Sequence, residues 1–203
     1  MNDSRPVIEA NIAKALQKTP KGTILFVDSF LNLGNPENIK KALYRLTNEK
    51  KVLIRLAHGI YLYPKIDEEL GILYPSTEEI AEAIAKRDKA RIVPTGIYAL
   101  NRLGLSTQVP MKIVYLTDGS ARNIKIGKRT ISFKRTTPKN LMTKGEISTL
   151  VIQALKEIGK ENVTDEILKQ LKTVLEKETQ ENISHDSNLA PAWINNILKQ
   201  SLK

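Results

Sequence analysis

The chain has 203 residues, of which 41% are hydrophobic, and this is enough apolar material for the core of one or two domains. It contains no Cys, which excludes disulfides, thiol nucleophiles and Cys-based zinc sites. The first residues contain no apolar run long enough for a signal peptide or a membrane span. We therefore expect a cytoplasmic protein without membrane association.

The net charge of +10 is distributed unevenly along the chain. Residues 1–140 hold 24 of the 32 Lys and Arg residues but only 13 of the 22 Asp and Glu residues. This concentration of positive charge favours nucleic-acid binding by the first two-thirds of the chain, followed by a neutral C-terminal extension. A basic membrane-surface helix is disfavoured, because no single helix combines a wide apolar face with a Lys/Arg face.

The first elements are expected in the order helix, strand and brief helix. They are residues 4–18, opened by Ser4 and Pro6; residues 23–27; and residues 29–33, with Asp28 as N-cap. Gly34 then makes a turn into a second helix, for which Asn35 suits the N-cap and Pro36 the first helical position.

This second helix is amphipathic. Its apolar residues recur at helical spacing and form one stripe: Ile39, Ala42, Leu43 and Leu46. Its other face is polar and mostly basic. Two alternating apolar runs follow, Val52–Leu56 and Ile60–Tyr63, and the bend between them contains Gly59, which tolerates a positive φ.

A polar, basic helix followed by a small hairpin is typical of a winged helix-turn-helix, in which the helix enters the DNA major groove and the hairpin is the wing. A plain structural helix and hairpin would show the same local pattern. The preceding helix, strand and short helix favour a winged helix-turn-helix DNA-binding domain over residues 1–65. The residues expected to bind DNA in this domain are Asn38, Lys40, Lys41, Tyr44, Arg45, Lys50, Lys51, Arg55 and His58. For two of them an alternative is open: Tyr44 packs on the wing, or His58 is merely exposed.

The middle region has an α/β pattern and is expected to form a second domain over residues 76–140. Residues 64–74 are a linker candidate, because they contain Pro64 and Gly71 and are followed by Pro75. The expected elements are a helix over 78–89 with a Ser76/Glu79 capping box, a strand over 91–93, a break at Pro94-Thr95, a helix over 96–103, a strand over 112–116, and a hairpin over 122–126 and 130–134.

The segment Arg122–Lys139 holds seven basic residues and no acidic one. This pattern favours a polyanionic partner, DNA, RNA or an acidic protein. The alternative is an edge strand that its lysines protect against aggregation. The residues expected to bind nucleic acid here are Arg122, Lys125, Lys128, Arg129, Lys134 and Arg135.

Residues 141–203 are expected to be entirely helical and to pack on the second domain. Helix starts are expected at a Thr143/Glu146 capping box, at Thr164 and at Pro191. The predicted fold class is therefore α+β: a winged helix-turn-helix, a central α/β domain with a basic β-hairpin, and a helical C-terminal region.

The run Pro94–Gly119 and the basic hairpin after it resemble the antitoxins of abortive-infection type IV toxin–antitoxin systems (AbiEi-like) and a related, poorly characterised bacterial family. The matching residues are Thr95-Gly96, Leu103-Gly104-Leu105, Thr107-Gln108-Val109-Pro110, Leu116-Thr117-Asp118-Gly119 and, on the wing, His58-Gly59-Ile60-Tyr61. The resemblance covers roughly residues 20–140, whereas the tail Leu189–Ile194 is more similar to the uncharacterised relatives.

The resemblance implies a transcriptional repressor that binds repeats in its own promoter and acts as an antitoxin. It also implies a second domain that contributes to DNA contact and opposes a nucleotidyltransferase-like toxin. The alternative function is a nucleic-acid-processing, nuclease-like enzyme or its accessory subunit, targeted by the winged helix.

The sequence offers little support for catalysis. Asp118 precedes the basic hairpin, but Ser132-Phe133-Lys134 stands where a nuclease would have its second carboxylate. Phosphate-binding glycine loops, Ser/His/Asp sets and zinc-ligand spacings do not occur. His58 and His185 lie on distant elements, and His185 has only Asp186 beside it. We expect a protein without catalytic residues, metal or cofactor.

Overall fold

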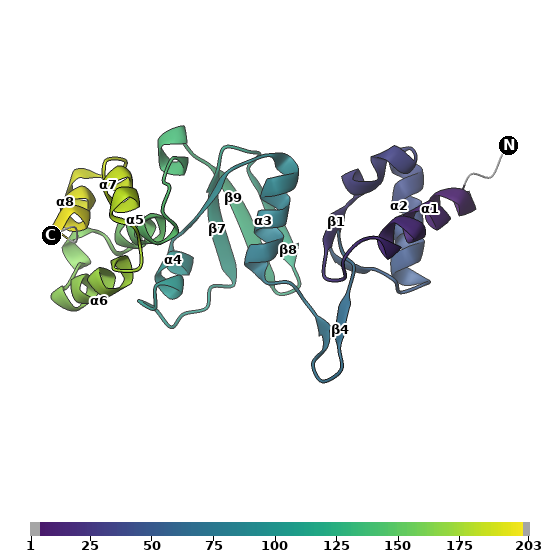
Figure 1. Ribbon diagram of the computed structural model, residues 1–203, viewed down its shortest axis with the longest axis horizontal. Helices are drawn as coiled ribbons and strands as arrows, with labels where there is room; N and C mark the ends of the chain where they lie inside the picture. The colour runs from purple at the N-terminus through teal and green to yellow at the C-terminus, as the bar shows by residue number, and fades with distance from the viewer. Residues whose placement is uncertain (1–4, 201–203) are drawn as a thin grey trace. The chain divides into compact units, whose positions relative to one another are not determined.

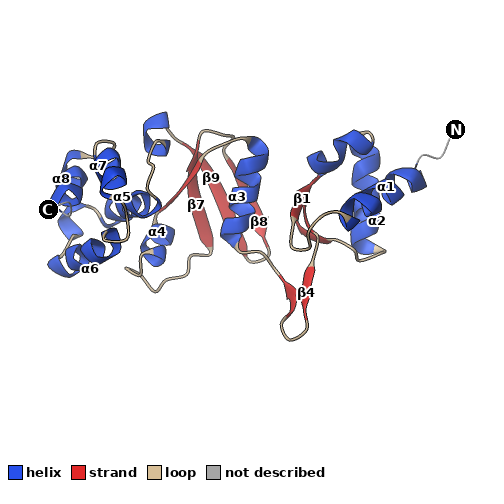
Figure 2. Ribbon diagram, viewed as in Figure 1, coloured by secondary structure: helices blue, strands red, loops and turns tan. Residues whose placement is uncertain are grey.

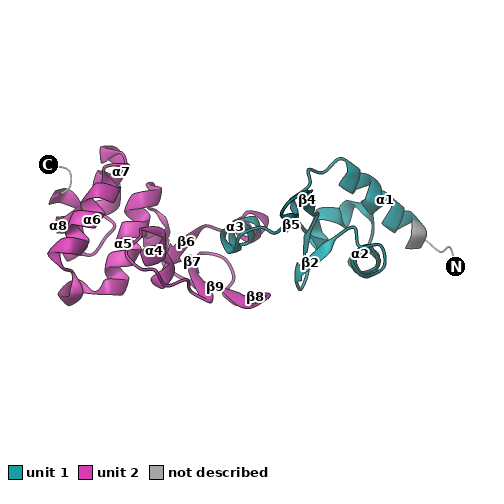
Figure 3. Ribbon diagram, turned by 90° about the horizontal axis from the view of Figure 1, so that it is seen from below, with its two compact units in different colours: residues 1–83 teal, residues 84–203 magenta. Residues whose placement is uncertain are grey.

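A computed structural model describes residues 5–200, with side chains from residue 7 onward; the expected helix start at Ser4 lies outside this range. Helices and strands are mixed along the chain, which confirms the α+β class (Figure 2). The chain divides into two compact units, unit 1 (residues 1–83) and unit 2 (residues 84–203) (Figure 3). The boundary lies inside helix α3, Thr77–Asp88. Residues 84–140 and the helices after residue 141 thus belong to one unit.

Unit 1 begins with three helices and a three-stranded sheet. The helices are α1 (Arg5–Gln17), the 3-10 helix η1 (Val27–Leu33) and α2 (Pro36–Asn48). The strands are β1 (Ile24–Phe26), β2 (Ile54–Ala57) and β3 (Ile60–Leu62), which pair antiparallel in the order β1-β3-β2 (Figure 1). The predicted order of helix, strand, helix, helix and hairpin is therefore present.

Helix α2 has the predicted start and the predicted buried face. The Asn35 side chain accepts a hydrogen bond from the N–H of Asn38 at 2.9 Å, and Pro36 occupies the first turn. All four residues of the predicted apolar stripe are buried. They share one core with α1 and η1, to which α1 contributes Ile8, Ile12 and Leu16 and η1 contributes Phe30.

The 3-10 helix η1, predicted as a brief helix over residues 29–33, begins earlier than predicted. It starts at Val27, directly after β1, and its N-terminal cap position falls on Phe26, whose N–H donates to the hydroxyl of Ser29 at 3.1 Å. The prediction of Asp28 as N-cap was therefore wrong. The reason is that β1 ends at Phe26, so no residue separates the strand from the helix.

The linker candidate, residues 64–74, has regular secondary structure. They contain a second hairpin made of β4 (Lys65–Asp67) and β5 (Gly71–Leu73), labelled β4 in Figure 1. The carboxylate of Asp67 accepts the N–H groups of Glu69 and Leu70, each at 3.0 Å, and so closes the turn. The sequence did not predict these strands, because three residues are too few to show an alternating pattern. The neighbouring turn-forming residues Pro64, Gly71 and Pro75 favoured a linker instead.

Unit 2 contains a four-stranded sheet in the order β6-β7-β9-β8. Its strands are β6 (Ile92–Thr95), β7 (Lys112–Thr117), β8 (Arg122–Ile126) and β9 (Arg129–Arg135); β7 and β9 are parallel and the other pairs antiparallel. The predicted hairpin over 122–134 is thus confirmed. The predicted break at Pro94 was wrong, because β6 is an edge strand and an edge strand tolerates a residue without an N–H.

Of the three capping predictions after residue 75, two are confirmed. Ser76 and Glu79 form the predicted reciprocal box, with N–H to side-chain distances of 2.7 and 3.1 Å. Thr164 caps α6 (Asp165–Leu175) through the N–H of Ile167. The remaining unit 2 helices are α4 (Ile97–Arg102), η2 (Pro138–Leu141), α5 (Glu146–Ile158), η3 (Lys160–Asn162), α7 (Gln180–Ser187) and α8 (Ala192–Gln200).

The Thr143/Glu146 capping box is not formed at the start of α5. Gly145 is the N-cap residue, and two carboxylates from later in the chain accept the N–H groups around it. Asp186 accepts from Lys144 and Gly145, at 2.8 and 2.9 Å, and Glu178 accepts from Ile147 at 3.0 Å. These tertiary acceptors replace the local cap.

Candidate nucleic-acid interface

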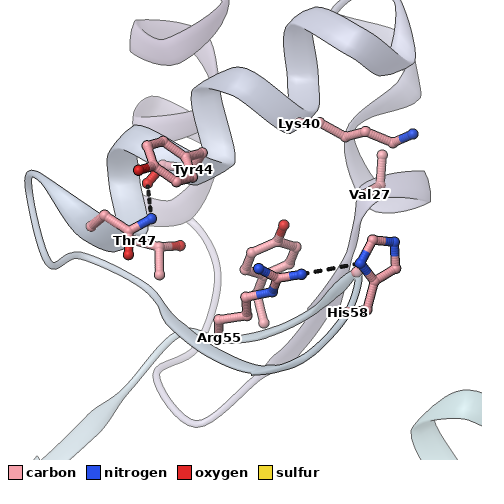
Figure 4. A pocket seen from close by; sticks show the side chains of 9 residues that line it. Val27, Lys40, Tyr44, Thr47, Arg55 and His58 are labelled. Atoms are coloured by element: carbon pink, nitrogen blue, oxygen red, sulfur yellow. Dashed lines mark hydrogen bonds between the residues drawn. The ribbon is translucent and has the colours of Figure 1, made fainter. Parts of the chain in front are cut away.

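A groove lies between α2 and the β2–β3 hairpin (Figure 4). Its lining comes mainly from these two elements: Val27, Lys40, Tyr44, Thr47, Asn48, Arg55, His58, Gly59 and Tyr61. The lining contains Lys, Arg and His side chains but no carboxylate. A groove with this composition attracts an anionic ligand.

The exposed face of α2 forms one wall of the groove. Lys40, Tyr44 and Asn48 recur at intervals of four residues and therefore lie on one side of the helix. Tyr44 is 60% exposed although it is a large aromatic residue. Its hydroxyl and ring are available to a partner, and it is not buried against the hairpin.

The hairpin forms the other wall. The guanidinium of Arg55 lies 3.1 Å from Nδ1 of His58, so the two side chains meet beside the turn (Figure 4). A register shift between Arg55 and Ala57 marks a β-bulge, which bends the strand next to the turn. Gly59 has φ +71°, a conformation that favours glycine, and so permits the tight bend. Tyr61 lies on β3, and burial raises the pKa of its hydroxyl.

Two cations that the sequence assigned to DNA contact are held by Glu9 of α1. Nε of Arg45 makes an ion pair with Oε2 of Glu9, and Nζ of Lys50 lies 2.5 Å from Oε1. The Glu9 residue is only 7% exposed. Hydrogen bonds from Lys50 and then Arg45 lower the pKa of the Glu9 carboxyl. Arg45 of α2 and Lys50, two residues after its end, therefore connect this part of the chain to α1.

Sequence reasoning missed Glu9. The available signal was its position beside Ile8, at the margin of the apolar face of α1, where a charged residue needs a partner. Of the other predicted residues, Lys41 and Lys51 are exposed and Asn38 is half-buried in the first turn of α2. Lys51 lies in the turn after α2 with φ +53°.

The basic residues of the unit 2 hairpin do not form one surface. The register pairs Lys125 with Thr130 and Asn123 with Ser132, so Lys125 and Lys134 lie on one face of the sheet. Arg122 pairs with Phe133 and lies on the opposite face, as do Arg129 and Arg135. Lys128 lies in the turn between the strands. The six predicted cations are thus divided between two faces and a turn.

Arg122 is also neutralised by a neighbour from α3. Its guanidinium makes an ion pair with Asp88 and lies 5.5 Å from the centre of the Phe133 ring. Burial raises the pKa of the Asp88 carboxyl, but hydrogen bonds from Arg87 and Arg122 outweigh it and the pKa is lowered. Arg135 donates from Nε to the carbonyl oxygen of Gly119 at 3.3 Å. Lys125, Lys128 and Lys134 are exposed, and their side chains are accessible to a polyanion.

Asp118, the carboxylate that a nuclease would use, has a structural partner. Asp118 accepts the backbone N–H of Arg91 at 2.8 Å and its Nε at 3.0 Å. These two hydrogen bonds, the backbone one first, lower the pKa of the carboxyl. Asp118 thus ties β6 to the end of β7. Within residues 5–200, no group of three or more His, Asp or Glu side chains is placed to hold a metal ion.

His185 has a partner network that the sequence did not show. Its Nδ1 lies 2.7 Å from Oδ1 of Asp186, and the hydroxyl of Ser148 donates to Oδ2 at 2.5 Å. Ser148 and Asp186 are fully buried. Because Ser148 binds the carboxylate and not the imidazole, this arrangement caps α5 and has no activated nucleophile.

A family model described as a family of unknown function, DUF6088, matches residues 11–183. A solved structure, the crystal structure of the RV2827C protein from Mycobacterium tuberculosis, is similar with a TM-score of 0.44 and 11% sequence identity. That match covers 96% of this chain and 82% of the other. No curated protein matches the sequence. None of the described helices is long and apolar enough to cross a membrane.

Proposed function

The chain belongs to the DUF6088 family, whose function is unknown, and we propose that it binds double-stranded DNA in a sequence-specific manner through a winged helix-turn-helix in unit 1. Helices η1 and α2 are the helix-turn-helix, α2 is the recognition helix, and the β2–β3 hairpin is the wing. The element order and the antiparallel sheet order β1-β3-β2 support this assignment.

The observation that carries the proposal is the groove between α2 and the hairpin. Lys40 and Tyr44 from the helix face Arg55 and His58 from the hairpin across a lining without carboxylates (Figure 4). A surface that needed charge only for solubility would mix both signs. An exposed aromatic residue among cations is, in addition, suited to contact with bases or sugars.

The side chains divide into two kinds of contact. Lys40 and Lys41 lie on the helix and have donor groups that read base edges in the major groove, whereas the amide of Asn48 donates to the carbonyl oxygen of Tyr44 at 3.2 Å. Arg55 and His58 lie on the wing, where donors to phosphate oxygens fix the orientation of a protein on the duplex. Arg45 and Lys50 are assigned to the α1–α2 contact, because Glu9 already holds both.

A finer proposal is that the protein represses its own promoter and is the antitoxin of a type IV toxin–antitoxin module, opposing a nucleotidyltransferase-like toxin. Its support is the sequence resemblance of Pro94–Gly119 and of the wing to AbiEi-like antitoxins. The enzyme alternative has weaker support, because the carboxylate it would use, Asp118, is engaged by Arg91.

The test is fluorescence anisotropy with DNA from the region upstream of the coding sequence and with the same bases in scrambled order. The wild type should prefer the upstream DNA, and Tyr44→Ala or Lys40→Gln should reduce that preference by about 1–3 kcal/mol if the side chain reads a base. Lys169→Gln, an exposed lysine of unit 2, is the matched control for Lys40→Gln. Equal affinity of the wild type for both DNAs, or no effect of either α2 variant, would refute the proposal.

A further inference from the structure

The β4–β5 hairpin has the densest group of exposed apolar side chains in unit 1. Within nine residues, Ile66 is 68% exposed, Leu70 77%, Ile72 41% and Tyr74 62%. Ile66 and Ile72 are direct cross-strand partners and therefore lie on the same face. We call residues 65–74 the arm. Its apolar face has no cover among the residues that the structure describes.

The arm also has unpaired edges. The β4–β5 sheet contains two strands, and no third strand of residues 5–200 joins it. A two-stranded hairpin is at best marginally stable in water, whereas three or more strands with an apolar face are stable. An exposed edge is also a template for pairing with another strand. Both the edges and the apolar face of the arm thus favour a partner strand.

The charge at the tip of the arm argues against nucleic acid as that partner. Asp67, Glu68 and Glu69 are consecutive carboxylates. Backbone hydrogen bonds from Leu70 and Glu69 lower the pKa of the Asp67 carboxyl and keep it ionised. Phosphates repel such a group. The arm thus favours a protein strand over nucleic acid.

The sequence of β4 is complementary to itself. If two copies of Lys65-Ile66-Asp67 pair antiparallel about Ile66, each Lys65 stands opposite the Asp67 of the other copy. Opposite charges in direct cross-strand positions stabilise a sheet. Ile66 then meets its own counterpart on the two-fold axis. Strand β5, Gly71-Ile72-Leu73, has no such charge pair.

We propose that β4 pairs antiparallel with β4 of a second copy, so that two arms form a four-stranded sheet and the protein is a homodimer. The interface is isologous, as in the commonest class of symmetric dimers. The pairing stands without any DNA-binding role. Only its consequence, two α2 helices placed on repeated half-sites, rests on the proposed function.

The first test uses the absence of Cys from the chain. In the pairing, the two Ile66 positions have Cα atoms about 4.5 or 5.5 Å apart, which lies within the range of a disulfide, about 4.4–6.8 Å. Mild oxidation of full-length, DNA-free Ile66→Cys protein should give a covalent dimer. Val109→Cys, at a site 63% exposed outside the arm, is the matched control and should stay mostly monomeric. Equal or absent cross-linking of the two variants would overturn the proposal.

The second test reverses a charge in the pair. Lys65→Glu places a carboxylate opposite Asp67, so sedimentation equilibrium without DNA should show a dimer Kd raised roughly tenfold. Lys169→Glu carries the same charge change on α6 and should leave the Kd unchanged. A wild type that is monomeric at all concentrations, or a dimer that Lys65→Glu does not weaken, would overturn the pairing. Failure of DNA binding changes neither measurement.

Discussion

The ion pair between Arg45 and Glu9 joins residues 36 positions apart and connects the proposed recognition helix to α1. Lys50 binds the other oxygen of the same carboxylate at 2.5 Å. Glu9 is nearly buried, so it depends on both cations. These ion pairs fix the orientation of α2. The carboxylate of Glu9 already binds the charges of Arg45 and Lys50.

We expect Glu9→Gln to destabilise unit 1 by about 1–3 kcal/mol, because it removes the negative charge that both Arg45 and Lys50 bind. Hydrogen exchange measured by mass spectrometry should show faster exchange in α1 and α2 and unchanged exchange in α5. The matched control is Glu37→Gln, an exposed glutamate in the first turn of α2. Unchanged protection of α1 in Glu9→Gln would show that the ion pair does not hold the helices together.

The same contact predicts a pH dependence. The pKa of Glu9 in the folded protein lies below its ordinary value of about 4.5. Its contribution to stability is therefore complete above pH 4.5 and is lost as the pH falls through the lowered pKa. Between about pH 6 and pH 3, the free energy of unfolding measured with urea should thus fall more for the wild type than for Glu9→Gln. Parallel pH profiles for the two proteins would contradict this assignment.

The lysines of the unit 2 hairpin predict a change in salt dependence. Replacing Lys125, Lys128 and Lys134 with Gln should weaken DNA binding equally for all sequences. The log–log salt slope should become shallower by about 0.9 for each phosphate that a lysine no longer neutralises. Arg122 is left in place because Asp88 neutralises it.

The control for this triple variant replaces three lysines outside the hairpin, Lys160, Lys169 and Lys172, with Gln. It removes the same total charge and should leave the slope as it is in the wild type. If the salt slope is also unchanged in the hairpin variant, the three hairpin lysines only protect the edge strand β8.

The β2–β3 hairpin, which is the proposed wing, depends on the backbone conformation of Gly59. No atom lies within 4 Å of a Cβ placed there, so the cost of Gly59→Val comes from φ +71° alone, about 1–2 kcal/mol. We expect lower DNA affinity because Arg55 and His58 flank this turn. Gly104→Val is the control, since Gly104 has φ +72° and equally open surroundings after α4. Equal DNA affinities of the two variants would argue against a role for the wing.

We expect Asp186 to contribute to the stability of unit 2. Asp186→Ala leaves the N–H groups of Lys144 and Gly145 without their acceptor and removes the carboxylate that the hydroxyl of Ser148 binds, which should cost about 3 kcal/mol or more. Fluorescence of Trp193, the single Trp, reports the loss because its ring packs on the same core as α5 and α7.

The control for Asp186 is Asp165→Ala at the exposed start of α6. Burial raises the pKa of Asp186, but hydrogen bonds from Ser148, His185, Lys144 and Gly145 outweigh it and lower the pKa below about 3.8. The stabilisation is therefore complete above that pH and is lost as the pH falls further. A midpoint in urea equal to that of the control would refute the role of the buried carboxylate.

The sequence by itself determined features that depend on neighbours three or four residues away. The cap of α2 at Asn35, the box of Ser76 with Glu79 and the cap of α6 at Thr164 all lie within one helical turn of their partners. The apolar stripe of α2 and the alternation in the 122–134 hairpin likewise follow from the periods of helix and strand. Lys40 and Tyr44 were among the residues expected to bind DNA, and both are exposed.

Only the tertiary structure decided which charges are free and which are held. Glu9 binds Arg45 and Lys50, Asp88 binds Arg122, and Asp186 replaces Thr143 at the start of α5. These partners lie 34 or more residues apart, and only folding brings them together. The physical reason is that these carboxylates find their donors wherever the packing of helices and strands places them, and no local spacing in the sequence encodes that choice.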